Sequence, residues 1–127
     1  LLWAFICASP VMAEEIEIDD AMAAALAEEP PLTIDDIDKF IKYFPQLDAA
    51  SEANDDVALK KIIDEAGWTE TRMTYVVFKT GFTLTMLQDP ETTAFFHTFF
   101  PVFMPLPEER RLIEQYADII GPLVDNP

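Results

Sequence analysis

The stretch from Thr69 to Gln88 constrains the fold of this chain most, because as a helix it would be apolar on almost every side. Large apolar side chains line two opposite sides of that helix: Met73, Val76, Val77, Leu84 and Leu87 on one, and Tyr75, Phe78 and Phe82 on the other. The only polar strip is narrow and consists of Arg72, Lys79 and Thr83. The β-branched residues also suit a strand, but the stretch lacks a strand's alternation. We therefore predict a central helix that other helices cover.

Helix-start and helix-stop signals upstream of this stretch predict two further helices. Thr33 followed by Asp36 resembles a capping box, and the helix that it opens is predicted to end at Pro45. A polar loop at 46–54 then leads to a second helix, which Gly67 is expected to stop in the left-handed conformation.

Two more helices are predicted downstream. Asp89–Pro90 supplies a cap and a first-turn proline for a helix that runs to about Phe100. Further prolines make the next stretch irregular until Pro107 opens the last helix, which a Gly–Pro pair at 121–122 closes. Short links between five helices predict an all-α fold, namely an antiparallel bundle of about five helices around the central third one.

The charge of the chain limits its partners. The sequence has 24 acidic and 8 basic residues, which gives a formal net charge of −16. Such a field repels nucleic acid and anionic membrane surfaces, so we expect neither as a partner. We expect a hydrophobic ligand or a partner protein, and the negative field favours cationic partners.

The first thirteen residues are typical of the end of an export signal. The segment 1–13 (LLWAFICASPVMA) is apolar and uncharged, and it ends in small or compact residues just before Glu14. We predict a signal peptide cleaved after Ala13, and hence a periplasmic or secreted protein. Cys7, the single cysteine, would leave with the signal, so the mature chain would have no disulfide. A buried N-terminal helix, or a membrane anchor lengthened upstream, is the alternative.

An acidic segment separates this signal from the predicted domain. Ten carboxylates and no lysine or arginine lie between Glu14 and Asp38. Only about two turns of good helix former precede the two prolines at 30–31, and a helix that short is marginal alone. We predict a loosely ordered leader at 14–31, which docks through Met22 and Leu26, and a helical domain at 32–127.

Three short motifs stand at predicted helix boundaries. They are the run Phe40–Leu47 (FIKYFPQL), the pair Gly67–Trp68, and the Pro-Glu-Glu opening of the last helix at 107–109. In this layout the segment from Leu32 to Val124 resembles a group of small exported all-helical proteobacterial proteins of unknown function. The resemblance implies no particular activity.

Residue types for catalysis are scarce. Beyond the predicted signal, Ser51 is the only serine, and His97 is the only histidine of the chain, expected at the surface. Nucleophilic catalysis needs such a hydroxyl or thiol beside a base, so we predict no catalytic residues and no cofactor. The acidic clusters at 35–38 and 54–56 lack the spacing, central glycine and closing glutamate of an EF-hand loop, so we predict no metal site, with weak binding of divalent cations as the alternative. A small hydrolase acting through carboxylates, with Glu65 beside Trp68 as a candidate, is one alternative. A structural or envelope-stress protein without a defined ligand is another.

The predicted binding site lies near the prolines that follow the fourth helix. Pro101 and Pro105 disfavour a continuous helix there, so one small bundle cannot easily bury every large apolar side chain of this region. We predict an apolar groove for a hydrophobic ligand, peptide or partner helix. Its mouth would be lined by Phe99, Phe100, Phe103 and Met104.

Overall fold

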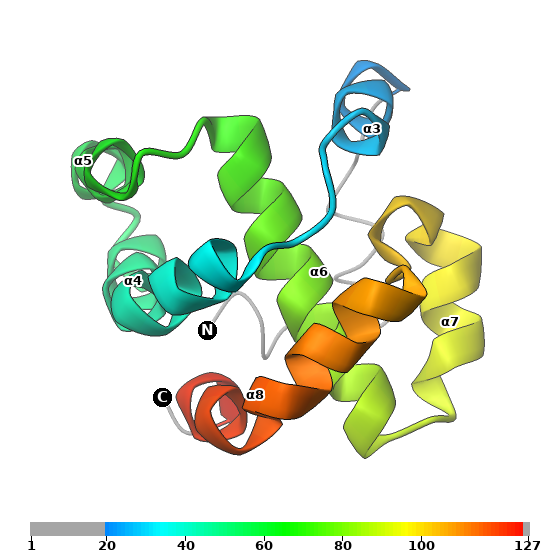
Figure 1. Ribbon diagram of the computed structural model, residues 1–127. Coiled ribbons are helices and arrows are strands. Elements are labelled where there is room, and N and C mark those ends of the chain that lie inside the picture. The colour runs from blue at the N-terminus through cyan, green and yellow to red at the C-terminus, as the bar shows by residue number, and fades with distance from the viewer. Residues whose placement is uncertain (1–19, 126–127) are drawn as a thin grey trace.

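The computed structural model describes residues 20–125, and within that range the chain is entirely helical apart from links and turns (Figure 1). Residues 20–125 form six α-helices and one 3-10 turn: α3 (Asp20–Ala27), α4 (Ile34–Glu52), α5 (Asp56–Ala66), α6 (Glu70–Gln88), α7 (Thr92–Phe99), η1 (Pro101–Phe103) and α8 (Pro107–Asp125). The all-α prediction is confirmed. The predicted signal segment, with Cys7 and Ala13, lies outside the described residues. None of the described helices is long and apolar enough to span a membrane.

Helix α6 occupies the centre of the domain, as its apolar circumference predicts. It packs against α3, α4, α7, η1 and α8. Figure 1 shows α6 crossing the middle, with α4 and α5 on one side and α7 on the other. Val76 and Thr80 are completely buried, and Phe82 is 1% exposed. The domain is therefore built around one helix rather than around a ring of equivalent ones.

The local signals act at the helix ends as predicted. The Thr33 hydroxyl accepts the backbone N–H of Asp36, and the Asp36 carboxylate accepts that of Thr33, which completes the capping box. The Thr69 hydroxyl accepts the N–H of Arg72 at the start of α6. Gly67 ends α5 at φ 76°, a left-handed conformation that glycine adopts without a Cβ clash.

The prediction that the first helix ends at Pro45 is wrong, because α4 continues to Glu52. A proline inside a helix removes one hydrogen bond and costs about 3 kcal/mol or more. Pro45 itself is exposed, whereas Phe44, Leu47 and Ala50 continue a buried stripe on the inner face. Burying such side chains offsets the proline's cost, and the predicted loop at 46–54 becomes helix over most of its length.

The boundaries of the last two helices also differ from the predicted ones. Helix α7 begins at Thr92, because the Asp89 carboxylate accepts the N–H of Glu91 in a turn that precedes the helix. Helix α8 continues through the Gly–Pro pair at 121–122 to Asp125. Ile120, just before that pair, is fully buried, so packing again extends a helix past residues that disfavour it.

The described part of the predicted leader packs on the domain. Helix α3 contacts α6 and η1. Its Leu26 side chain is 1% exposed, while Met22 remains 42% exposed. Leu26 is therefore the residue that α3 buries in the core.

Candidate functional site

The structure places the four predicted groove residues in different surroundings. Phe100 and Phe103 are 3% and 1% exposed, and their rings pack on that of Phe82 at centroid distances of 5.1 and 5.4 Å. Phe99 is 54% exposed and contacts Phe95 at 4.9 Å. Two of the four are thus core residues, because η1 follows α7 directly and turns Phe103 back onto α6.

Met104, the fourth, lines a hollow of about 450 Å³ between α6, the α6–α7 link and the start of α8. Its apolar walls include Met86 and Leu87, and Thr83 and Arg110 add polar groups. Of the predicted set, Met104 therefore lines a surface hollow.

A second and more apolar pocket lies between α4, α5 and α6, and we name it the α4–α5–α6 pocket. Its volume is about 140 Å³. Six apolar side chains line it: Phe44, Leu47, Leu59, Met73, Val77 and Phe78. The polar lining residues are Asp48 and Ser51 of α4.

Sequence reasoning missed this pocket because it ended the first helix too early. Residues 44, 47, 48 and 51 follow the spacing that places side chains on one helix face. That spacing has no meaning across a loop, and the sequence predicted a loop from residue 46. Because α4 continues past Pro45, Asp48 and Ser51 come to lie beside Phe44.

The Asp48 carboxyl is the titratable group of this pocket. Its partial burial, and after that the nearby Glu52 carboxylate, raise the pKa of Asp48 above its ordinary value. Both causes disfavour the charged form, because burial removes water and a like charge repels. The pocket thus combines an apolar interior with a carboxyl whose charged form is disfavoured on balance.

A second cluster of side chains, which we name the polar seam, follows another face of α6. It consists of Asp36, Arg72, Tyr75, Lys79 and Glu109. Its α6 members occupy positions 72, 75 and 79, which share one side of a helix. The sequence identified Arg72 and Lys79 as a polar strip, but it did not identify their partners.

Glu109 is the fully buried anion of the polar seam. Its Oε1 lies 2.8 Å from Nζ of Lys79, which is 5% exposed. Its Oε2 accepts the Tyr75 hydroxyl at 2.7 Å and the backbone N–H of Leu32 at 2.9 Å, while Oε1 also accepts the N–H of Leu106 at 2.9 Å. A buried carboxylate needs such compensation, and here four donors supply it.

The pKa shifts of these groups follow from the contacts. Burial alone would raise the pKa of Glu109, but the hydrogen bonds from Lys79, from two backbone N–H groups and from Tyr75 outweigh it and hold the pKa below its ordinary value. Burial, and then the Glu109 carboxylate that accepts its proton, raise the pKa of the Tyr75 hydroxyl. Glu109 is therefore a fixed anion and not a proton donor at neutral pH.

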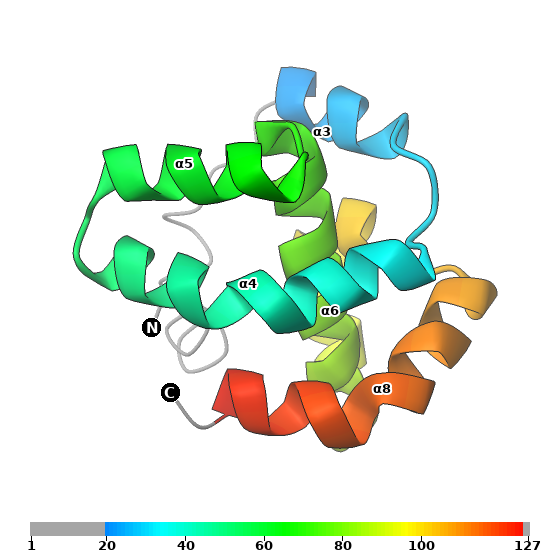
Figure 2. The ribbon, with the colours of Figure 1, turned by 60° about the vertical axis from the view of Figure 1, so that its left-hand side comes forward.

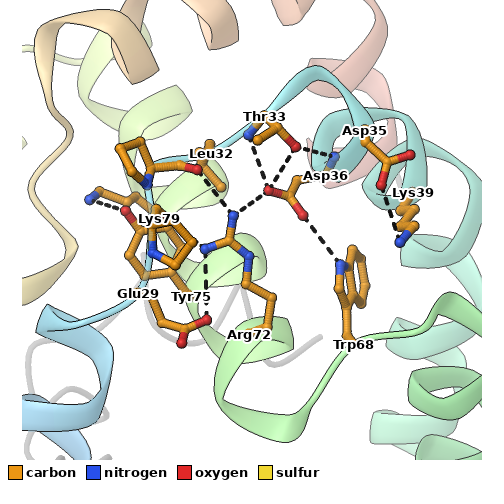
Figure 3. Close-up of polar contacts among 12 residues, drawn as sticks. Glu29, Leu32, Thr33, Asp35, Asp36, Lys39, Trp68, Arg72, Tyr75 and Lys79 are labelled. Carbon is orange, nitrogen blue, oxygen red and sulfur yellow. Dashed lines mark hydrogen bonds and ion pairs between the residues drawn. The ribbon is translucent and has the colours of Figure 1, made fainter.

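Arg72 joins the chain before α4 to the central helix at the other end of the polar seam (Figure 3). Its guanidinium pairs with Asp36, donates to the carbonyl oxygens of Pro30 and Pro31 at 2.5 and 3.1 Å, and lies 3.7 Å from the Glu29 carboxylate. A planar guanidinium has five N–H donors and can therefore bind several separate acceptors at once.

Asp36 has a third role beside its cap and its ion pair. Nε1 of Trp68 donates to its Oδ1 at 3.4 Å. Burial would raise the pKa of Asp36, but the hydrogen bonds from Arg72 and Thr33 outweigh burial and lower it. The ring of Tyr75 connects the two ends of the seam. Cζ of Arg72 lies 4.9 Å from the ring centroid, and Nζ of Lys79 lies 4.5 Å from it.

The seam binds its own members and offers little to a substrate. Each carboxylate accepts several internal donors and is held ionised, which suits a structural clamp better than proton transfer. Among the other candidates, His97 and Glu65 are exposed. No group of three or more potential metal-ligating side chains occurs within the described residues. The apolar pocket is thus the better candidate site.

Comparisons with known proteins returned no match. No protein-family model, no curated protein and no solved structure matches this chain.

Proposed function

We propose that this protein is a non-catalytic binding module whose α4–α5–α6 pocket takes a small hydrophobic ligand. The observation that carries the proposal is the pocket itself, with about 140 Å³ of space and six apolar lining side chains. An engineered apolar cavity of roughly 150 Å³ in another protein binds benzene. A ligand group of about one ring is the size that fits.

The composition of the lining supports binding rather than catalysis. Ligand sites are mostly apolar with a few polar groups that orient the ligand, and Asp48 and Ser51 stand in that position. A carboxylate-dependent hydrolase needs a second carboxyl that acts on the opposite side of the scissile bond. Asp48 and Glu52 lie on one helix, four residues apart, and that arrangement does not suit such a pair.

We further propose that the protein acts outside the cytoplasm. Segment 1–13 is removed as a signal peptide, and 14–31 remains as the leader of the mature chain. The uncharged apolar start and the small residues before Glu14 support export. We also propose an antiparallel bundle as the frame of the pocket. In support, α4 and α5 lie side by side and a short turn joins them (Figure 2).

Filling the pocket tests the proposed binding. Val77→Phe places a ring where the ligand would lie, and Val57→Phe makes the same change at a side chain that is 81% exposed outside the pocket. We expect benzene to shift the NMR signal of the Met73 methyl group in the parent and in Val57→Phe, and to shift it far less in Val77→Phe. Equal shifts in all three proteins, or no shift in the parent, would refute the pocket as a ligand site.

A further inference from the structure

The rim of the α4–α5–α6 pocket is acidic. Asp48 lines the pocket, and Glu52 follows it by four residues on the same helix. Side chains four residues apart on a helix are neighbours, so both carboxyls lie on this side of α4. Among residues 20–123, no lysine or arginine forms an ion pair with Asp48.

A cation from outside the chain would relieve two unfavourable effects at Asp48. Partial burial and the repulsion from Glu52 both act against its charged form. A charge-assisted hydrogen bond compensates for lost hydration, and an added positive charge offsets the repulsion. The formal net charge of −16 favours the approach of a cation and opposes that of an anion.

The interior of the pocket determines the rest of the ligand. Its volume of about 140 Å³ and its lining by Leu59, Met73 and Val77 favour an uncharged apolar group. Ser51 also lines the pocket from the same face of α4 as Asp48, and a hydroxyl can accept a hydrogen bond from an ammonium group.

We propose that the ligand is a small amine, with its ammonium group beside Asp48 and Ser51 and an apolar group of about one ring in the pocket. This inference rests on the proposed function, because it names the chemical class of ligand for the same pocket.

Three probes with one ring in common test the inference by calorimetric titration. They are 2-phenylethylamine, which is a cation at neutral pH, 2-phenylethanol, which is neutral, and phenylacetate, which is an anion. We expect the amine to bind about tenfold more tightly than the alcohol, the range that one hydrogen bond to a charged group supports. Phenylacetate should bind most weakly, and added salt should reduce the advantage of the amine.

Two variants that each remove one negative charge locate the effect. Asp48→Asn should reduce the advantage of the amine over the alcohol to near onefold. Asp38→Asn is the matched control, because Asp38 is exposed on the same helix and does not line the pocket. It should keep the advantage of the amine, and thermal melting monitored by circular dichroism should show both variants folded.

The outcomes separate the two proposals. If parent protein binds the alcohol and the amine equally, the amine inference fails and the apolar binding function stands. If none of the three probes binds, both fail. If Asp38→Asn lowers amine binding as much as Asp48→Asn does, the net field and not the rim selects the cation, and the assignment to Asp48 is overturned.

Discussion

Two faces of the same helix differ in how completely their neighbours fill them. On one face of α6, Arg72, Tyr75 and Lys79 meet partners from the chain before α4, from α4 itself and from α8. On another face, Met73 and Val77 border about 140 Å³ of space beneath α4 and α5. Both faces belong to one rigid element, so the difference lies in what packs against them.

The difference has a physical cause. A buried charge without a partner is very unfavourable, so the polar seam requires acceptors at defined positions. Apolar contact has no direction, and a small gap between apolar side chains costs only the contacts that are missing. Rigid positioning is therefore concentrated at the seam, and room for a ligand exists where apolar side chains meet.

The largest effect should follow from removing the buried anion of the seam. Glu109→Ala removes the buried anion that pairs with Lys79 and accepts the Tyr75 hydroxyl and two backbone N–H groups, so we expect the free energy of unfolding to fall by about 3–5 kcal/mol. Lys79→Met should cost less, because Glu109 keeps its other donors. Urea denaturation followed by circular dichroism measures both. Glu108, the exposed neighbour, is the control, and Glu108→Ala should change stability by less than about 1 kcal/mol. An equal loss in the two alanine variants would contradict the central role of Glu109.

The next effect should appear at the chain before α4. Arg72→Met removes the ion pair with Asp36 and two bonds to carbonyl oxygens, so a loss of about 1.5–3 kcal/mol is expected. Amide hydrogen exchange over 20–31 should accelerate more than exchange in α6. Arg111→Met, at an exposed arginine, serves as the control. Unchanged exchange over 20–31 would show that Leu26 packing alone holds this segment.

Adjacent valines on α6 offer a sharper comparison of filled and unfilled surroundings. Val76 is fully buried in the core, so Val76→Phe overpacks it and should cost about 1–3 kcal/mol. Val77 borders the pocket, so Val77→Phe should cost less than about 1 kcal/mol, since the added ring has space. Midpoints of urea denaturation compare the two. Similar losses at both positions would mean that the pocket does not accept a ring.

The smallest effect concerns the pH dependence of stability, to which the polar seam and the pocket should contribute with opposite signs. The pKa values of Asp36 and Glu109 are lowered by folding, so their contribution to stability is complete above their unfolded values and is lost as pH falls through the folded ones. The pKa of Asp48 is raised by folding, so its charge lowers the stability of the folded protein at neutral pH. This cost disappears as pH falls toward the pKa of Asp48 in the unfolded chain, about 4.

Asp48→Asn separates the two contributions. At neutral pH we expect it to stabilise the protein by no more than about 0.5 kcal/mol, because the side chain is partly exposed. Below about pH 5 its stability should approach that of the parent, and both proteins should lose stability below about pH 4 as the seam carboxylates protonate. Thermal melting across pH 3–7 measures this, and a destabilised Asn variant at pH 7 would show that the Asp48 charge is already compensated.

Local chemistry explains what could be predicted from the sequence. The caps at Thr33 and Thr69 and the stop at Gly67 depend on groups within four residues of each other, and the structure has all of them. The central position of α6 follows from its apolar circumference, which only surrounding helices can cover. The polar strip with Arg72 and Lys79 could also have predicted a buried acidic partner, because a lysine inside such a helix requires a buried acid elsewhere.

Only the tertiary structure decided which acid that is and where the pocket lies. Glu109 and its neighbour Glu108 are equivalent first-turn acids in the sequence, and the packing of α8 on α6 buries one and exposes the other. By local rules Pro45 ends a helix, yet α4 continues beyond it because Phe44 and Leu47 become buried. This continuation places Asp48 and Ser51 on one helix face. At Pro45, long-range burial outweighs a local cost of a few kcal/mol, and at Glu109 the packing of α8 distinguishes two acids that are locally alike. Neither outcome can be computed from neighbouring residues alone.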